Sequence, residues 1–227
     1  MYLTAMPAGR PGARKDYSCD ANAGNQGSVC PEFDIIEANA RATQSTLHKC
    51  DLNGGNYSNC DQGGAIAKPA AVGLFDQKTG TVIDTSKVFN VSVAFRAGNV
   101  SANTVDTVDT VSAGESAGGA AGGAAGGAAG GGAGGNAGRG SGGGAALVGM
   151  EVTYSQSGRN FTLVPTTDAR YLQSLTEAME HGLVAQMSLW GGAASVMSWL
   201  DEPPCGASED CDPTAVATWS NFAVRSL

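Results

Sequence analysis

The chain has 227 residues and a formal net charge of −8, with a pI near 4.6. An acidic surface repels the phosphates of nucleic acids and of anionic membranes, which disfavours both as partners, whereas a neutral glycan suits it. No apolar run approaches the roughly 20 residues of a membrane-spanning helix. Residues 1–6 lack the basic start and long apolar stretch of a signal peptide, and we expect them to be a strand that is cut into.

The first informative element is a predicted strand in which three acids are threaded between bulky apolar residues. Because side chains on a strand point to alternate faces, Glu32 and Asp34 share one face while Phe33 points into a core. Glu37 falls out of phase with this alternation. It rejoins the face of the other two acids only if a bulge at residues 35–36 absorbs one residue.

The bulge also sets a distance between the outer acids. With one residue absorbed, the Cα atoms of Glu32 and Glu37 lie about four rises apart, roughly 13 Å. Side chains that lean together then bring the carboxyl groups to on the order of 5 Å, the separation at which a retaining glycosidase uses one as nucleophile and the other as acid/base. Such close acids cannot all ionise freely, so the pKa of at least one should rise. Three surface acids on an edge strand are the alternative interpretation.

Two separated blocks carry a family resemblance. Cys30 to Asn39 reads as a Cys before Glu-x-Asp-x-x-Glu-Ala-Asn, and His48 to Cys50 as the His-x-Cys that follows it. Far downstream, Gln186 to Trp190 ends in Met-Ser-Leu-Trp, and Trp199 to Asp201 is a Trp-Leu-Asp nine residues later. Both blocks resemble glycoside hydrolase family 7, the fungal-type cellobiohydrolases and endoglucanases. Weaker echoes of that family lie at residues 2–6 and 219–222.

The resemblance implies a role for each acid. Glu32 would be the nucleophile and Glu37 the general acid/base, while Asp34 would hydrogen-bond Glu32 and hold its orientation. His48 would sit at the edge of the site, touching the sugar or tuning a carboxyl group, although a single His is as often structural. The resemblance implies neither a cofactor nor a metal.

Aromatic residues are expected to bind the sugar. Pyranose rings stack their C–H faces on an indole, and we favour this role over a core position for Trp190 and Trp199, because small residues follow Trp190. Tyr2, from the opening motif, is predicted to bind substrate as well. Trp219 we interpret as a core residue.

The cysteines favour an oxidising, extracellular compartment. Six cysteines form an even count in three neighbouring clusters. The pairs Cys19–Cys30 and Cys50–Cys60 fit the family's staples around its catalytic strand, and Cys205–Cys211 is predicted as a local pair. No Cys-x-x-Cys spacing indicates zinc. Asn-x-Ser/Thr sequons are compatible with a secreted glycoprotein.

The chain divides around a low-complexity segment. Residues 1–112 alternate short apolar strands with Gly, Asn and Ser turns. Residues 113–146 are Gly/Ala repeats that bury too little surface to offset their ordering entropy, which predicts a flexible insertion. The strand pattern resumes over residues 147–227. We therefore predict one partial family-7-like catalytic domain, formed by 1–112 and 147–227, with the insertion at a hairpin tip.

One helix is predicted, from Asp168 to Gly182. Leu172, Leu175 and Met179 recur at helical spacing, Asp168 is a cap and Gly182 a stop. The resemblance implies an all-β fold, an antiparallel β-sandwich of the concanavalin-like jelly-roll type. Because the resemblance covers about the C-terminal half of the family's catalytic domain, we expect the sandwich to be incomplete at its N-terminus.

The functional hypothesis is retaining hydrolysis of β-1,4-glucosidic bonds in cellulose or a related glucan, with endo cleavage favoured. The enzyme would be a secreted monomer without a cofactor. The alternatives are an inactive fragment or a non-catalytic β-sandwich that binds glycans. A metal site built from the three acids and His48 is a weaker third interpretation.

Overall fold

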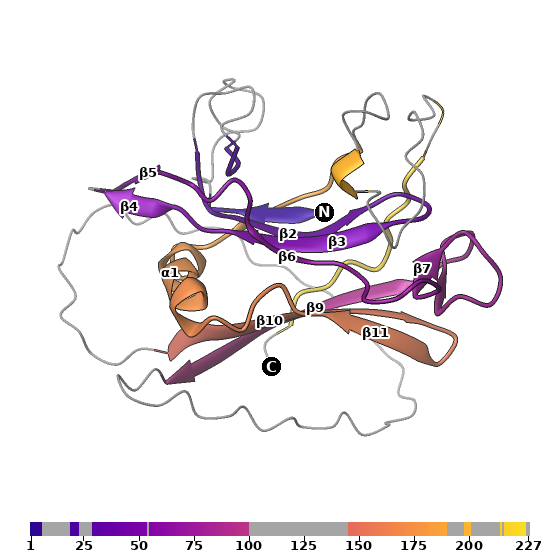
Figure 1. Ribbon diagram of the computed structural model, residues 1–227. Helices are drawn as coiled ribbons and strands as arrows, with labels where there is room; N and C mark the ends of the chain where they lie inside the picture. The colour runs from indigo at the N-terminus through magenta and orange to yellow at the C-terminus, as the bar shows by residue number, and fades with distance from the viewer. Residues whose placement is uncertain are drawn as a thin grey trace, which may run out of the picture. The chain divides into compact units, whose positions relative to one another are not determined.

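The computed structural model describes residues 1–5, 19–22, 29–53, 55–99, 145–189, 198–200, 214 and 216–225. Their strands and helices are drawn in Figure 1. The elements are β1 (Tyr2–Thr4), β2 (Glu32–Ala38), β3 (Thr43–His48), β4 (Asp51–Asn53), β5 (Asn56–Ser58), β6 (Ala65–Ala67), β7 (Phe75–Asp76), β8 (Ile83–Asp84), β9 (Asn90–Asn99), β10 (Ala145–Gln156), β11 (Arg159–Leu163), α1 (Ala169–Glu180) and β12 (Val184–Gln186).

A five-stranded sheet holds the acid strand at its centre. Its order is β12-β1-β2-β3-β6, and each pair of neighbours is antiparallel. The alternation of side chains along β2 buries Phe33 and Ile35 in the core, as predicted. Leu47, the cross-strand partner of Phe33 on β3, is fully buried beside it. One face of this sheet therefore forms half of the hydrophobic core.

A three-stranded sheet, of order β11-β10-β9, supplies the other half. Met150, Val152 and Tyr154 alternate along β10 and are all fully buried. Ser157 and Gly158 connect β10 to β11, with φ of 51° and 77°, the left-handed conformations that a tight two-residue hairpin requires. β9 and β10, which flank the predicted insertion, are neighbours in this sheet. Of the predicted insertion 113–146, residues 113–144 lie outside the described part of the chain, whereas Ala145 and Ala146 already belong to β10.

The two sheets face each other across a shared core, and Figure 1 shows them as two layers. The ring of Phe33 on β2 meets Phe95 on β9 edge to face, with centroids 6.0 Å apart. The hydroxyl of Tyr154 on β10 lies 2.8 Å from Thr43 Oγ1 on β3. Such packing of two antiparallel sheets defines a β-sandwich, so the predicted fold class is confirmed.

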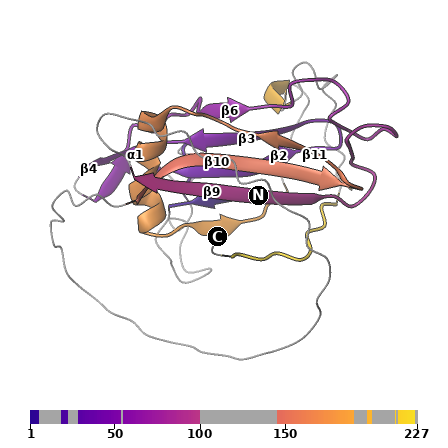
Figure 2. The same ribbon diagram turned by 90° about the horizontal axis from the view of Figure 1, so that it is seen from below.

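The predicted helix is also confirmed, as α1. Asp168 caps it, since its carboxylate accepts the backbone N–H groups of Arg170 and Tyr171. Gly182 follows the end of the helix with φ of +92°. α1 lies at one end of the sandwich in both views (Figures 1 and 2). Within the described ranges, no helix is long and apolar enough to cross a membrane.

One aromatic residue departs from its prediction. Trp219, interpreted from the sequence as a core residue, is 41 % exposed. Residues 216–225 form no strand or helix, and Phe222 in the same segment is exposed too. The indole therefore has no sheet to bury it, and the core assignment is wrong.

Candidate active site

The register between β2 and β3 shows how the acids are placed. Glu32 pairs with His48 and Asp34 pairs with Thr46, but the next pair on the same face is Glu37 with Gln44. Two residues of β2, Ile35 and Ile36, therefore stand against one of β3, Ser45, and the register shift lies between Asp34 and Glu37. This is the bulge that the sequence predicts at residues 35–36.

The backbone around the bulge is fully bonded. The N–H groups of Ile35 and Ile36 both donate to the carbonyl oxygen of Met1 on the β1 side, at 3.1 Å each. On the β3 side, the hydroxyl of Ser45 donates to the carbonyl oxygen of Ile35 at 2.6 Å. Because buried backbone groups are costly to leave unpaired, these bonds stabilise the extra residue in place.

The bulge brings all the acids to one face. On the regular strand β3, Gln44, Thr46 and His48 alternate and so point the same way. Paired residues of an antiparallel ladder share a face, so Glu37, Asp34 and Glu32 point that way too. The prediction of a kinked strand with its carboxylates on one face is confirmed.

Glu32 is buried and anchored at its outer end. Its side chain is only 8 % exposed, and its carboxylate accepts the backbone N–H of Ala21 at 3.0 Å. The disulfide between Cys19 and Cys30 holds that short segment beside the start of β2. Burial, followed by repulsion from Asp34, raises the pKa of Glu32 well above its ordinary value, while the Ala21 N–H acts in the opposite direction.

Glu37 lies at the other end of the face. Its carboxylate accepts the amide N–H of Gln44 at 2.9 Å and the hydroxyl of Thr46 at 3.4 Å. Burial and repulsion from Asp34, in that order, raise the pKa of Glu37 as well. Two acids with raised pKa values on either side of Asp34 match the expected effect of crowding three carboxyl groups.

His48 supplies the positive charge of the cluster. Its Nε2 lies 3.3 Å from Asp34 Oδ2, and its Nδ1 lies 2.7 Å from the carbonyl oxygen of Asp61. Burial lowers the pKa of His48, but the bonds to Asp34 and to the Asp61 carbonyl outweigh it and raise the pKa to about 9. The imidazole is therefore an imidazolium at neutral pH, with one N–H for each acceptor.

The same cluster offers ligand atoms to a cation. One atom each from Glu32, Asp34 and His48 lie within 4.8 Å of one another. In this structure both ring nitrogens of His48 face oxygen acceptors, Asp34 Oδ2 and the Asp61 carbonyl.

Two further residues that the sequence predicts to bind substrate, Tyr2 and Trp199, lie in the described part of the chain. Tyr2 pairs with Asp34 on β2 and with Gln186 on β12. It therefore lies on the acid face, the face of the five-stranded sheet that carries Glu32, Asp34 and Glu37. Its hydroxyl donates to Gln186 Oε1 at 3.2 Å. Trp199 lies half-buried in a helical turn at residues 198–200, where its carbonyl accepts from the ammonium of Lys68.

Among the predicted disulfides, Cys19–Cys30 and Cys50–Cys60 are formed. Cys205–Cys211 and Trp190 fall outside the described residues, so the pairing and the stacking role stay predictions.

Some contacting residues were missed by sequence reasoning. Ala21 and Asp61 act on Glu32 and His48 through backbone groups, which leave no signature in side-chain chemistry. Gln44 and Thr46 carried a signal, because they lie four and two residues before His48 and so share its face of a strand. Placing them opposite the acids requires the register, which the sequence alone does not supply.

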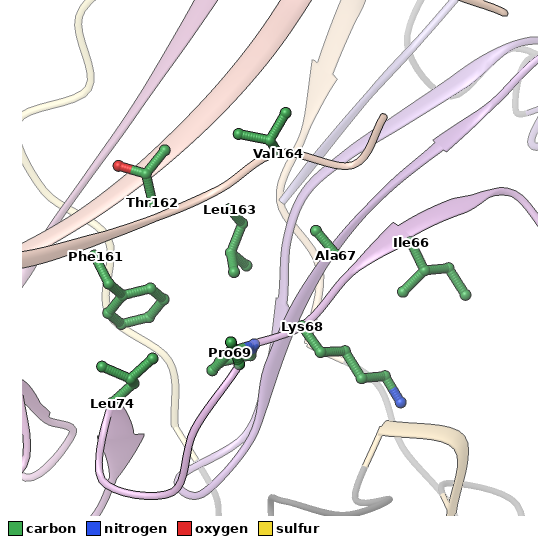
Figure 3. A pocket seen from close by; sticks show the side chains of 10 residues that line it. Ile66, Ala67, Lys68, Pro69, Leu74, Phe161, Thr162, Leu163 and Val164 are labelled. Atoms are coloured by element: carbon green, nitrogen blue, oxygen red, sulfur yellow. The ribbon is translucent and has the colours of Figure 1, made fainter. Parts of the chain in front are cut away.

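A cavity of about 360 Å³ lies elsewhere, between the outer strands β6 and β11. Figure 3 shows its lining of Ile66, Ala67 and Pro69 on one side and Phe161 and Leu163 on the other. Most of the lining residues are apolar in type, with Lys68 and Thr162 among them, and none of the acids of β2 is included. This cavity is therefore separate from the carboxylate cluster.

Comparisons with known proteins agree with the geometry. No protein-family model matches the chain. The probable endo-beta-1,4-glucanase celB of Aspergillus fumigatus is 28 % identical over 218 residues, which cover 90 % of this chain and 46 % of that protein. Endoglucanase EG-1 of Hypocrea jecorina is 26 % identical over 196 residues, covering 83 % and 34 % respectively. The chain thus spans less than half the length of these curated relatives.

Solved structures show the same fold. Endocellulase EGI of Humicola insolens aligns with a TM-score of 0.55 and 19 % identity, over 94 % of this chain and 56 % of that one. An endoglucanase I complexed with cellobiose gives 0.55 and 18 % over the same shares. A GH7 family cellobiohydrolase from Daphnia pulex gives 0.51 and 14 %, over 94 % and 60 %. The predicted resemblance is confirmed: the chain is similar, over most of its length, to part of a glycoside hydrolase family 7 jelly roll.

Proposed function

We propose that the chain carries the catalytic centre of a retaining glycosidase that cleaves β-1,4-glucosidic bonds in cellulose or a related glucan. One observation carries the proposal: the bulge of β2 places Glu37 on the same face as Glu32 and Asp34. Two carboxyl groups facing one sugar are what retaining hydrolysis requires. The similarity to proteins named endo-beta-1,4-glucanase supports the substrate and favours endo cleavage.

In the first step, the ionised carboxylate of Glu32 attacks the anomeric carbon while Glu37 donates its proton to the glycosidic oxygen, whose bond to that carbon breaks. In the second step, Glu37 takes a proton from water, and the water oxygen displaces Glu32 from the anomeric carbon. The raised pKa of Glu37 suits a group that must start protonated. Burial and Asp34 raise the pKa of Glu32 as well, and the Ala21 N–H and the charge of His48 act against that rise, so they increase the ionised fraction of Glu32 that attacks.

Further observations support a secreted enzyme that acts on a neutral polysaccharide. Disulfides Cys19–Cys30 and Cys50–Cys60 persist in oxidising compartments, which supports secretion. The net charge of −8 suits a neutral polysaccharide better than a polyanion. Tyr2 on the acid face, together with Trp190 and Trp199, would contact the sugar rings.

Paired aryl β-cellobiosides with good and poor leaving groups test the roles. Glu32→Gln removes the nucleophile, so hydrolysis of both substrates should fall by about 10²-fold or more. Glu37→Gln removes the proton donor, which a good leaving group does not need; the first step should then fall far more for the poor leaving group. Glu180→Gln on the exposed end of α1 is the matched control and should leave both rates unchanged. Hydrolysis that survives both active-site changes would reject the assignments.

A non-catalytic glycan-binding sandwich is the second candidate. It is favoured by one observation, that the chain spans less than half the length of its curated relatives. The unsubstituted chain separates the two: binding of a soluble glucan without release of reducing ends supports the second candidate, and release supports the first.

A further inference from the structure

The turn that follows Cys60 contacts one side of the His48 ring and is itself held by several bonds. Cys60 is bonded to Cys50, and the N–H of Asp61 donates to the carbonyl of Lys49 at 2.8 Å. The carbonyl of Asp61 then faces His48 Nδ1 at 2.7 Å. Its carboxylate turns back to accept the N–H of Gly64 at 3.0 Å. Asp61 thus closes the turn with its side chain and contacts the imidazole with its backbone.

Gly64 brings the turn against the imidazole ring. It has φ of +63°, which favours glycine, and a Cβ at this position would lie 2.7 Å from His48 Cε1 and Nδ1 and 2.5 Å from a methyl of Thr46. The backbone of the turn therefore lies so close to the ring that a side chain at residue 64 would clash with it. Together the Asp61 carbonyl and Gly64 fix both the proton and the plane of His48.

A helix anchors the turn from the other side. The hydroxyl of Tyr171 on α1 lies 3.0 Å from Asp61 Oδ2 and 2.6 Å from the carbonyl of Leu47. Leu47 precedes His48 on β3, so the phenol ties the turn, the strand and the helix at one point. Lys49 Nζ lies 5.2 Å above the same ring.

We propose that the Asp61–Gly64 turn, anchored by Tyr171, is a positioning element that keeps His48 doubly protonated and aimed at Asp34. Asp61, Gly64 and Tyr171 are positioning residues, because they act through His48. A carbonyl acceptor at Nδ1 leaves Nε2 to donate to Asp34, and the resulting imidazolium offsets the charge of Asp34 and Glu32. The carboxyl groups that face His48 are Asp34 and Glu32 on β2, and β6, which pairs with β3 on its other side, contributes none. The catalytic part of this inference rests on the proposed function.

Nitrogen NMR of histidine-labelled protein tests the positioning directly, because His48 and His181 are the only two histidines. In the unsubstituted chain, His48 should titrate with a pKa of about 9. Asp61→Ala removes both side-chain anchors of the turn, so the His48 midpoint should fall by about one unit or more. Asp61→Asn, which retains an acceptor for the Gly64 N–H, should restore part of that fall.

Asp51→Ala is the matched control. Asp51 follows Cys50 as Asp61 follows Cys60, but it lies exposed on β4 and bonds Asn59 instead. A His48 midpoint and ring shifts that are the same in Asp61→Ala and Asp51→Ala would overturn the proposal. If Asp61→Ala does not fold, Tyr171→Phe removes one anchor alone and should lower the midpoint in the same direction; no shift there would overturn it equally.

Rate measurements separate this inference from the proposed function. The acidic limb of kcat/KM for an aryl β-cellobioside, which follows ionisation of Glu32, should move to higher pH in Asp61→Ala, because a weaker imidazolium favours the Glu32 carboxylate less. If the NMR shift is observed but no hydrolysis is detected, the positioning element is supported and the hydrolase function is rejected. If Asp61→Ala and the unsubstituted chain hydrolyse the substrate with the same pH profile, the hydrolase function is supported and a catalytic role of the turn is rejected.

Discussion

At the residue scale, burial and the repulsion between neighbouring carboxyl groups set the protonation of the acid face. Glu32, Asp34 and Glu37 share one side of β2, and His48 is the cation that faces them. Burial and mutual repulsion favour the protonated forms of Glu32 and Glu37 in the folded chain. A folded state that holds protons more tightly than the unfolded chain loses stability as pH rises above the ordinary pKa of about 4.5. The charges that suit catalysis thus destabilise the fold.

Replacing Glu32 by Gln should therefore stabilise the chain at neutral and alkaline pH. The variant keeps an oxygen for the Ala21 N–H but has no proton to lose. We expect its free energy of unfolding to exceed that of the unsubstituted chain by about 1–2 kcal/mol at pH 8, and the difference to vanish below about pH 4. Urea unfolding at pH 4, 6 and 8 measures this.

The exposed Glu180→Gln serves as the control for that series and should change stability little at any pH. Equal stability of the Glu32→Gln variant and the unsubstituted chain across the whole range would show that Glu32 ionises without cost.

At the scale of elements, the bulge converts an out-of-phase acid into an in-phase one. The extra residue interrupts the pairing of β2 with β3, and there the buried hydroxyl of Ser45 donates to the carbonyl of Ile35. Met1 serves the two N–H groups on the other side. A bulge held by specific bonds is a built feature of the strand, and Glu37 depends on it.

Ser45→Ala should lower the free energy of unfolding by about 1–3 kcal/mol, because the Ile35 carbonyl stays buried without its donor. Hydrolysis should fall as well, since Glu37 lies on the far side of the bulge. Ser174→Ala, the same change at an exposed site on α1, is the control. Thermal unfolding and the rate of hydrolysis of an aryl β-cellobioside measure the two effects. Unchanged stability would mean that the Ser45 hydroxyl does not stabilise the bulge.

The bulge could be predicted because Glu37 breaks the period of two that Phe33 and Asp34 establish. Helix α1 could be predicted because its cap at Asp168 and its stop at Gly182 are local signals. The Ala21 and Asp61 contacts could not, since they depend on how distant backbone segments meet. Trp219 was misjudged because indole hydrophobicity predicts burial only where a partner surface exists.

At the scale of the whole molecule, a buried hydrogen bond between Tyr154 and Thr43 joins the two sheets through the core. Tyr154 on β10 is fully buried, and its ring stacks on Phe161 with centroids 4.9 Å apart. Its hydroxyl meets Thr43 Oγ1 at the start of β3. Burial raises the pKa of Tyr154, so the phenol stays neutral at all working pH values. This bond fixes how the acid-bearing sheet sits on its partner.

Tyr154→Phe should cost about 1–2 kcal/mol of stability, because Thr43 loses its buried partner. The double variant Tyr154→Phe, Thr43→Val removes both polar groups and should recover part of that loss. Denaturant unfolding of the two single variants and the double variant completes the cycle. Strictly additive losses would show that the hydroxyls do not stabilise each other.

The Cys19–Cys30 bridge bears on how the chain is produced. Ala21 reaches Glu32 from a segment that the bridge ties to β2, and its N–H is one of the groups that favour an ionised Glu32. A bacterial cytoplasm keeps thiols reduced, so material from that host would arrive with this tether open. Folded protein from such a source would keep its sheets yet start with a less reactive nucleophile, and the choice of expression host becomes an experimental variable in its own right.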